Sequence, residues 1–152
     1  HKFEYRATEN TSHATTSISF PWMLSNNIAD WSTHDASTTM EGLYVYTLGV
    51  NTTDFKFILG EFNNGVPAQT TFYTGTIGTS YWLKVTRAGT AFNLYIYSEN
   101  TFTTLLATLS LTLTMSAGQA FQYLYGFNSY GASVTSQLIS GYVDTLRIGT
   151  KV

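Results

Sequence analysis

Apolar and polar residues alternate along most of this chain, in short runs separated by Gly and Asn. This period of two is typical of β-strands, and no long window keeps the i, i+3, i+4, i+7 spacing of an amphipathic helix. The clearest hairpin joins Tyr81–Val85 to Phe92–Ile96 through the turn Arg87–Thr90. Another hairpin is predicted at Asn63–Gly65, whose residues suit positive φ. The pattern therefore predicts an all-β fold.

Alternation continues in further predicted strands, namely Lys2–Thr8, Leu43–Tyr46, Asp54–Phe62, Leu105–Leu113, Phe121–Phe127 and Ile139–Ile148. A gap of three between the apolar residues Val143 and Leu146 predicts one extra residue, a β-bulge, near Asp144. We expect a two-sheet antiparallel β-sandwich that occupies residues 1–152 as a single domain. Its core is expected to include Leu83, Val85, Phe92, Leu94, Ile96, Leu109, Leu111 and Leu146.

Two segments lack clean alternation and are predicted to be irregular. One is Pro21–Thr39, and the other is Ser129–Gln137, which is rich in Gly, Ser and Thr. Long loops in compact domains tend to carry function, so the first segment is a candidate binding loop.

Charge is sparse, at 11% of residues with a net charge of −2. Such a chain has no broad positive field, so we expect no capture of nucleic acid. No apolar run is long enough for a membrane helix, so we expect no membrane insertion. The absence of Cys excludes disulfides, zinc–thiolate sites and a thiol nucleophile.

The stretch Gly78–Ser98, followed by Thr104–Leu113 and Ile139–Ile148, carries a Trp strand, an Arg-x-Gly turn, a YIY strand and a late Gly-aromatic-Val-Asp element. In this order and spacing it resembles the concanavalin A-like superfamily, in its laminin-G-type jelly roll. The resemblance covers Gly78–Ile148, and it implies a jelly-roll sandwich. The family's opening strand finds no counterpart before His1, so we expect a processed or excised segment that lacks this strand. The resemblance raises calcium binding, but the family's calcium ligands do not match residue by residue, and we expect no cofactor.

Aromatic residues make up 16% of the chain and suggest a ligand. A sugar needs a flat apolar ring and fixed polar partners for its hydroxyls, and the irregular loop offers both. The candidate glycan-binding residues are Trp22, Asn26, Asn27, Asp30, Trp31, His34 and Asp35, with Tyr95 and Tyr97 as a neighbouring platform. The alternative is that both tryptophans pack as plugs over the end of the sandwich.

Tyrosines also recur as i, i+2 pairs, which place two rings on the same face of a strand. The pairs are Tyr44 and Tyr46, Tyr95 and Tyr97, and Tyr123 and Tyr125. Facing outward they form a platform for a glycan or protein, and facing inward they fill the core. We expect Tyr123 and Tyr125 to belong to the core.

Catalytic patterns are missing from the sequence, and we expect a protein that is not an enzyme. Paired carboxylates at alternate strand positions would mark a glycosidase, but Glu61, Glu99 and Asp144 each lack such a partner. No Gly-x-Ser-x-Gly motif marks a nucleophile. Metal binding stays open: His1 with His13 or His34 could hold copper, and Asp30, His34 and Asp35 could hold another cation.

Two functions fit the sequence. The first is a recognition module that binds glycan outside the cell, at the cell surface or on a virion. The second is a structural subunit of a fibre, surface layer, capsid or tail that binds copies of itself or other proteins, since a weakly charged surface packs without a large desolvation cost. Glycosylation at Asn10 or Asn51, which both match the acceptor sequon, is left open.

Overall fold

The computed structural model describes residues 1–10, 17–26, 39–125, 128–131 and 139–147, and these form strands and turns without a helix. The strands are β1 (Lys2–Asn10), β2 (Ser17–Ser25), β3 (Gly42–Gly49), β4 (Asp54–Asn63), β5 (Val66–Thr76), β6 (Ser80–Ala88), β7 (Ala91–Tyr97), β8 (Leu105–Thr112), β9 (Tyr123–Tyr125), β10 (Asn128–Gly131) and β11 (Ile139–Arg147). Since none of the described residues is helical, no helix long and apolar enough to cross a membrane is found among them.

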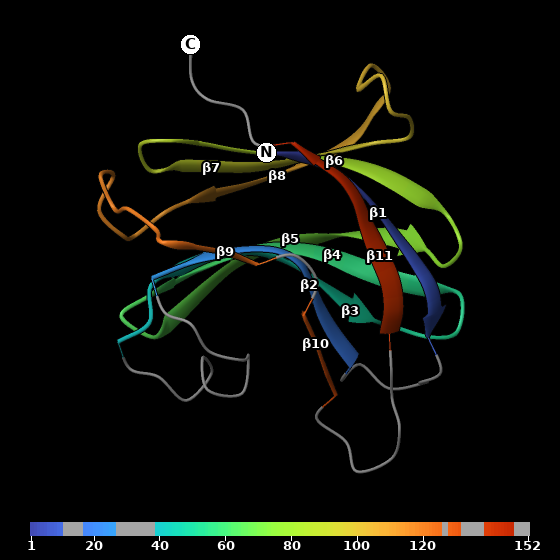
Figure 1. The fold of residues 1–152 in the computed structure, drawn as a ribbon, viewed down its shortest axis with the longest axis horizontal. Coiled ribbons are helices and arrows are strands. Elements are labelled where there is room, and N and C mark those ends of the chain that lie inside the picture. Colours follow the sequence, from blue (N-terminus) through green and yellow to red (C-terminus); the bar gives the residue numbers. More distant parts are fainter. Residues whose placement is uncertain (11–16, 27–38, 126–127, 132–138, 148–152) are drawn as a thin grey trace.

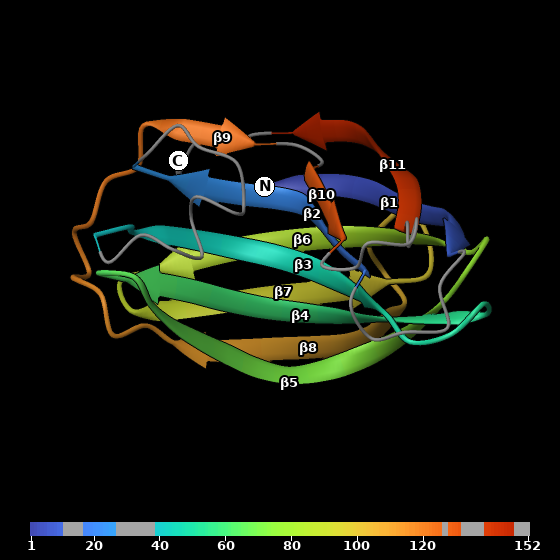
Figure 2. The same cartoon turned by 90° about the horizontal axis from the view of Figure 1, so that it is seen from below.

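Two antiparallel sheets stack face to face, as Figures 1 and 2 show. One has the order β11-β1-β6-β7-β8 and is called sheet A below. Sheet B has the order β10-β2-β3-β4-β5, with β9 also paired to β2. The predicted all-β two-sheet sandwich is therefore confirmed.

The hairpin turns follow the predicted chemistry. Asn64 and Gly65 take φ values of 50° and 77° between β4 and β5, as a two-residue turn with two positive φ angles requires. Gly89, with φ 60°, begins the turn between β6 and β7. Asn and Gly accept this backbone region at little cost, so these residues fix where each strand reverses.

The predicted bulge near Asp144 is confirmed by the register of β1 against β11. Lys2 pairs with Arg147 and Glu4 pairs with Asp144. Between these two pairs the chain advances by three residues on β11 but by two on β1. One extra residue therefore lies between Asp144 and Arg147, which accounts for the broken alternation in the sequence.

The interior between the sheets is filled by aliphatic and aromatic side chains. Of the predicted core residues, those fully buried are Leu83, Val85, Phe92, Leu94, Ile96 and Leu109. Leu111 is partly buried against the same cluster. The side chain of Leu146 lies outside the described part. The aliphatic face of the β6–β7 hairpin was thus assigned correctly.

The irregular segment predicted from Pro21 begins later than expected, because β2 continues through Pro21 to Ser25. The reason is a register shift between β2 and β3: Ser19 pairs with Thr47, whereas Trp22 pairs with Val45. β2 therefore has one extra residue at this point, a β-bulge. Pro21 lies in the bulge, where its lack of an N–H costs no hydrogen bond between the strands. The second predicted irregular segment is also wrong at its start, because Ser129–Gly131 belongs to β10.

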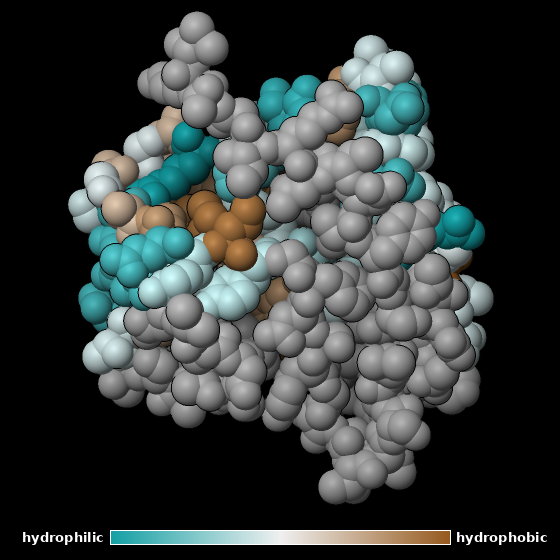
Figure 3. Space-filling model, viewed as in Figure 1, coloured by the Kyte–Doolittle hydropathy of each residue, from teal (hydrophilic) through white to brown (hydrophobic). Residues whose placement is uncertain are grey.

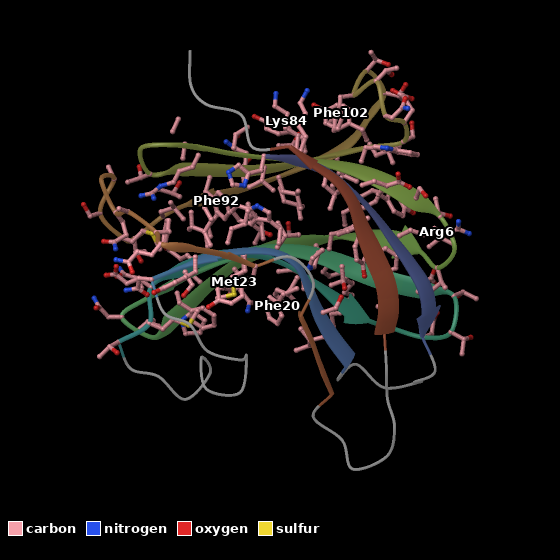
Figure 4. The ribbon with its side chains drawn as sticks, in the orientation of Figure 1. Arg6, Phe20, Met23, Lys84, Phe92 and Phe102 are labelled. Carbon is pink, nitrogen blue, oxygen red and sulfur yellow. The ribbon has the colours of Figure 1, made fainter. Side chains whose placement is uncertain are left out.

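A second hydrophobic cluster covers the outer side of sheet B. It contains Phe20, Met23, Met40, Tyr44, Tyr46, Ile58 and Phe62, all buried, with Ile18, Leu48 and Tyr125 packed against it. Figure 4 shows Phe20 and Met23 beyond this sheet, while Phe92 points into the space between the sheets. The pair Tyr44 and Tyr46 is therefore core, and this face is not an open platform.

Buried polar groups join the two sheets. The Tyr5 hydroxyl on β1 lies 3.3 Å from Ser19 Oγ and 3.1 Å from Thr47 Oγ1, and these two oxygens are 2.6 Å apart. Near the C-terminal end of β4, the fully buried Glu61 carboxylate accepts hydrogen bonds from the backbone amides of Thr114 and Met115, at 2.6 and 3.3 Å. These bonds link sheet B to sheet A and to the chain that follows it.

Candidate functional site

The outer side of sheet A gathers aromatic side chains in register. Trp82 on β6 pairs with Tyr97 on β7, and two residues further along the same strands Lys84 pairs with Tyr95. Leu83, between the two β6 residues, is fully buried, whereas the four paired residues are only half-buried. Because side chains alternate along a strand, these four point away from the core.

Strand β1 extends the same surface. Lys2 pairs with Lys84 and Glu4 with Trp82, and both β1 residues are half-buried. Two rows therefore cross the sheet, one from Lys2 through Lys84 to Tyr95 and the other from Glu4 through Trp82 to Tyr97. Together with Phe102, these residues are called the outer aromatic face.

Phe102 comes from the loop between β7 and β8 and leans onto this surface. Its ring meets that of Tyr97 edge to face, with centroids 5.3 Å apart. The Lys2 ammonium lies 4.5 Å from the centre of the Phe102 ring, and the Lys84 ammonium lies 5.5 Å from that of Tyr95. Figure 4 shows Lys84 and Phe102 on the outer side of the sheet. The lysine stems therefore pack on the rings while their charged ends stay at the surface.

Glu99 fixes the conformation of the loop that carries Phe102. Its carboxylate accepts hydrogen bonds from the Thr103 hydroxyl at 2.7 Å, the Thr103 amide at 3.1 Å and the Thr104 amide. The backbone amide of Thr104 is the largest cause that lowers the pKa of Glu99 to about 2. Phe102 itself has a φ of 58°, which is unfavourable for a bulky residue. The hydrogen bonds of Glu99 stabilise the turn in which Phe102 adopts this positive φ.

Trp22, the first residue of the predicted loop site, lies in the core of the sandwich. It is 2% exposed, and its Nε1 donates a hydrogen bond to Nδ1 of His1 at 2.8 Å. Its ring is tilted against Phe92 with centroids 6.1 Å apart. A sugar cannot reach a ring buried in this way, so the position of Trp22 fits the alternative of a packing role.

Asn26 is occupied by backbone contacts. Its side-chain Oδ1 accepts a hydrogen bond from the backbone amide of Glu41 at 3.0 Å, and its backbone amide donates to the Glu41 carbonyl at 3.2 Å. The remaining loop candidates lie outside the described residues; they are Asn27, Asp30, Trp31, His34 and Asp35. The glycan loop stays a prediction.

The predicted tyrosine platform falls on the outer aromatic face, since Tyr95 and Tyr97 both point away from the core. Tyr123 and Tyr125 are half-buried on β9, and Tyr125 packs against the second cluster. From the side shown in Figure 3, the described surface is mostly hydrophilic, with a hydrophobic spot at the level of β9. On sheet A, the half-buried rings of Trp82 and Tyr97 are paired in register, with Tyr95 in the next row.

Metal and acid–base groups are dispersed in the described part of the chain, where no three His, Cys, Asp or Glu side chains come together. His1 is held by the sheet, because its backbone nitrogen donates to the Val85 carbonyl at 2.8 Å and its Nδ1 accepts from Trp22. Glu61 is bound by backbone amides and is not paired with a second carboxylate among the described residues. His13 lies outside them.

Sequence reasoning missed most of the outer aromatic face. Trp82 lies at the polar-side position between Tyr81 and Leu83 of the predicted hairpin, and neither Trp82 nor Phe102 is among the residues predicted to bind a ligand. A large aromatic residue at a polar-side position of a clear hairpin was the available signal. The contributions of Lys2 and Glu4 depend on the pairing of β1 with β6, which nothing local in the sequence indicates.

Comparison with models of known protein families and with curated proteins finds no match for this chain. The assignment of function therefore depends on the residues themselves.

Proposed function

We propose that this protein is a non-catalytic recognition module that binds glycans through the outer aromatic face. The observation that supports this is the registered array of Trp82, Tyr95 and Tyr97, with Phe102 beside them. All four rings are half-buried, so each is held by its neighbours and still reaches the surface.

The chemistry of this surface suits a sugar. Pyranose rings stack their axial C–H faces on aromatic rings, and their hydroxyls need charged or amide partners at fixed positions. Glu4 lies beside Trp82 on the neighbouring strand and offers a hydrogen-bond acceptor. Lys84 lies two residues after Trp82 on the same strand and offers a donor. Because the groups stand on strands, little conformational entropy is lost when a ligand binds.

The wider context belongs to the same proposal. We place the protein outside the cell, at the cell surface or on a virion, a setting that its low charge and its many Thr and Ser residues suit. We also propose that the sandwich is a concanavalin A-like jelly roll, on the strength of the motifs in Gly78–Ile148. No cofactor is part of the proposed binding.

A glycan array followed by calorimetry on the binders tests the function. Trp82→Ala and Tyr97→Ala should each weaken binding at least tenfold, because stacking on the ring is lost, while the folded state persists. The matched control is Phe72→Ala, which removes a 52% exposed ring from β5 on the other sheet and should leave binding unchanged. Equal binding by wild type and a folded Trp82→Ala variant would remove this face from the site.

A structural subunit that binds copies of itself is the second candidate, and the sheet edges favour it. β5 and β8 end the two sheets, and neither contains Lys, Arg, Asp or Glu. Large apolar side chains are exposed there, with Val66 at 67%, Leu105 at 49% and Leu106 at 41%. Native edges usually carry charges that block pairing with another strand.

Light scattering after size-exclusion chromatography tests this candidate. A homo-oligomer that Ser110→Lys in β8 converts to a monomer would support the structural role, because the new charge blocks edge pairing. A wild-type monomer across the accessible concentration range would count against it.

A further inference from the structure

Basic residues are concentrated in one row of sheet A. Lys2 on β1 pairs with Lys84 on β6 on one side and with Arg147 on β11 on the other. The chain has only 7 Lys and Arg residues and a net charge of −2, yet three of its basic residues take consecutive positions across adjacent strands. Such a row is not expected from a sparse and slightly acidic composition.

Like charges directly opposite each other destabilise a sheet. Lys2 and Lys84 are such a pair, and among the described residues no carboxylate lies within ion-pair distance of either ammonium. The nearest acid in register is Glu4, one row further along the sheet. Each ammonium instead lies over a ring, Lys2 over Phe102 and Lys84 over Tyr95. The pair is therefore a cationic spot beside an aromatic surface, and no carboxylate of the described part forms an ion pair with it.

We infer that the ligand of the outer aromatic face is an acidic sugar, one that carries a carboxylate or sulfate group. This inference rests on the proposed glycan-binding function and specifies its ligand class. The aromatic rings take the apolar face of the sugar, and the anionic group lies between Lys2 and Lys84. Bonds from an ammonium to an anionic oxygen are charge-assisted and stronger than bonds between neutral groups.

The experiment compares defined oligosaccharides in calorimetry with the full chain. A uronic-acid oligosaccharide and a sulfated oligosaccharide are measured beside a neutral one of the same length. We expect either acidic ligand to bind at least tenfold more tightly than the neutral one at low salt. The advantage should shrink at 1 M salt, where charge interactions are screened beyond about 3 Å. The two acidic ligands show which anion is preferred.

Matched lysine variants test the residues. Lys84→Gln and Lys2→Gln should each weaken acidic-ligand binding about tenfold, the size of one charged hydrogen bond. The neutral sugar should lose less affinity than the acidic ligands in both variants, because only an anionic group forms a charge-assisted bond with the ammonium. The control is Lys56→Gln on sheet B, because Lys56 also lies over a ring, Phe72, at 4.0 Å but far from the row. This variant should bind as wild type.

The outcomes separate the inference from the function that it extends. Equal binding of acidic and neutral sugars, lost in Trp82→Ala, would overturn the inference and keep the proposed function. Failure of every glycan to bind would overturn both. Tighter binding of a single-stranded oligonucleotide than of any acidic sugar would replace the glycan by nucleic acid as the ligand.

Discussion

Gly60 on β4 is the position where one added methyl group should be most damaging. Gly60 pairs with Tyr44 on β3, and the Tyr44 ring lies directly over it on the outer side of sheet B. A Cβ built at Gly60 would lie 2.4 Å from two carbons of that ring. Ordinary carbon–carbon contacts are about 3.5 to 4 Å, so the ring would have to move by more than about 1 Å.

Tyr44 has no room for such a movement. The ring is fully buried, and its centroid lies 5.0 Å from that of Phe62 and 5.8 Å from that of Phe20. Overpacking of this kind costs about 1 to 3 kcal/mol, and the gain from replacing Gly by Ala in a strand offsets about 0.5 to 1 kcal/mol. We expect Gly60→Ala to destabilise the protein by about 1 to 2 kcal/mol, which is about 2 to 8 °C in Tm for a domain of this size.

Urea unfolding followed by circular dichroism measures the effect. The control is Gly118→Ala, at a glycine with nothing within 4 Å of its built Cβ, and this variant should be neutral. In a Tyr44→Ala background the cost of Gly60→Ala should disappear, because the ring that it meets is gone. A cost below 0.5 kcal/mol in the wild-type background would refute the packing argument.

Three further outcomes follow from the described contacts. Glu61→Gln should cost about 1 to 3 kcal/mol in urea unfolding, since the two backbone amides bond to different carboxylate oxygens and Gln replaces one of these by an NH2 group that cannot accept; an unchanged midpoint would contradict this. Trp22→Ala should cost about 3 to 5 kcal/mol in the same assay, because the ring is buried, and a loss under 1 kcal/mol would return Trp22 to the binding loop. The Glu99 pKa of about 2, lowered from 4.5, means that the Thr104 amide should stay protected from exchange above pH 4.5 and lose protection as the pH falls toward 2. Hydrogen exchange by NMR measures this, and protection that persists below pH 2 would show that Glu99 does not hold the loop.

The period-two pattern could predict the fold because the two faces of most strands differ in polarity. The β6–β7 hairpin shows this directly, with Leu83, Val85 and Leu94 buried and their neighbours half-buried. The broken spacing around Asp144 was informative for the same reason, since a bulge restores the alternation.

The pattern failed where both faces of a strand are covered. On β2 the consecutive residues from Ser19 to Met23 are all buried, because the second cluster packs on the outer side of sheet B. A strand buried on both faces shows no alternation, and Pro21 suggested a loop. The sequence also fails to predict that β3 is buried on both faces around Tyr44, since this burial depends on which segment covers the sheet.

The candidate site was only partly accessible to sequence reasoning. Tyr95 and Tyr97 were found because i, i+2 spacing puts both on one face of a strand. Trp82 and Lys2 join them through pairings between β7 and β6 and between β6 and β1. The second of these pairings joins Lys2 to Lys84, about half the chain length apart, so local sequence carries no signal for it.

A two-sheet sandwich has two outer faces, and in this protein they differ in how far their side chains are buried. The outer face of sheet B is occupied by its own buried cluster, in which the Tyr46 hydroxyl donates to Gln69 at 3.0 Å and Tyr44 covers Gly60. The buried aromatic residues of this cluster stabilise the fold and offer no surface to a ligand. On sheet A the rings stay half-buried, and two lysines lie opposite each other at a cost to stability. This arrangement suits the proposed acidic sugar, because its anionic group would offset the repulsion between the two ammonium groups.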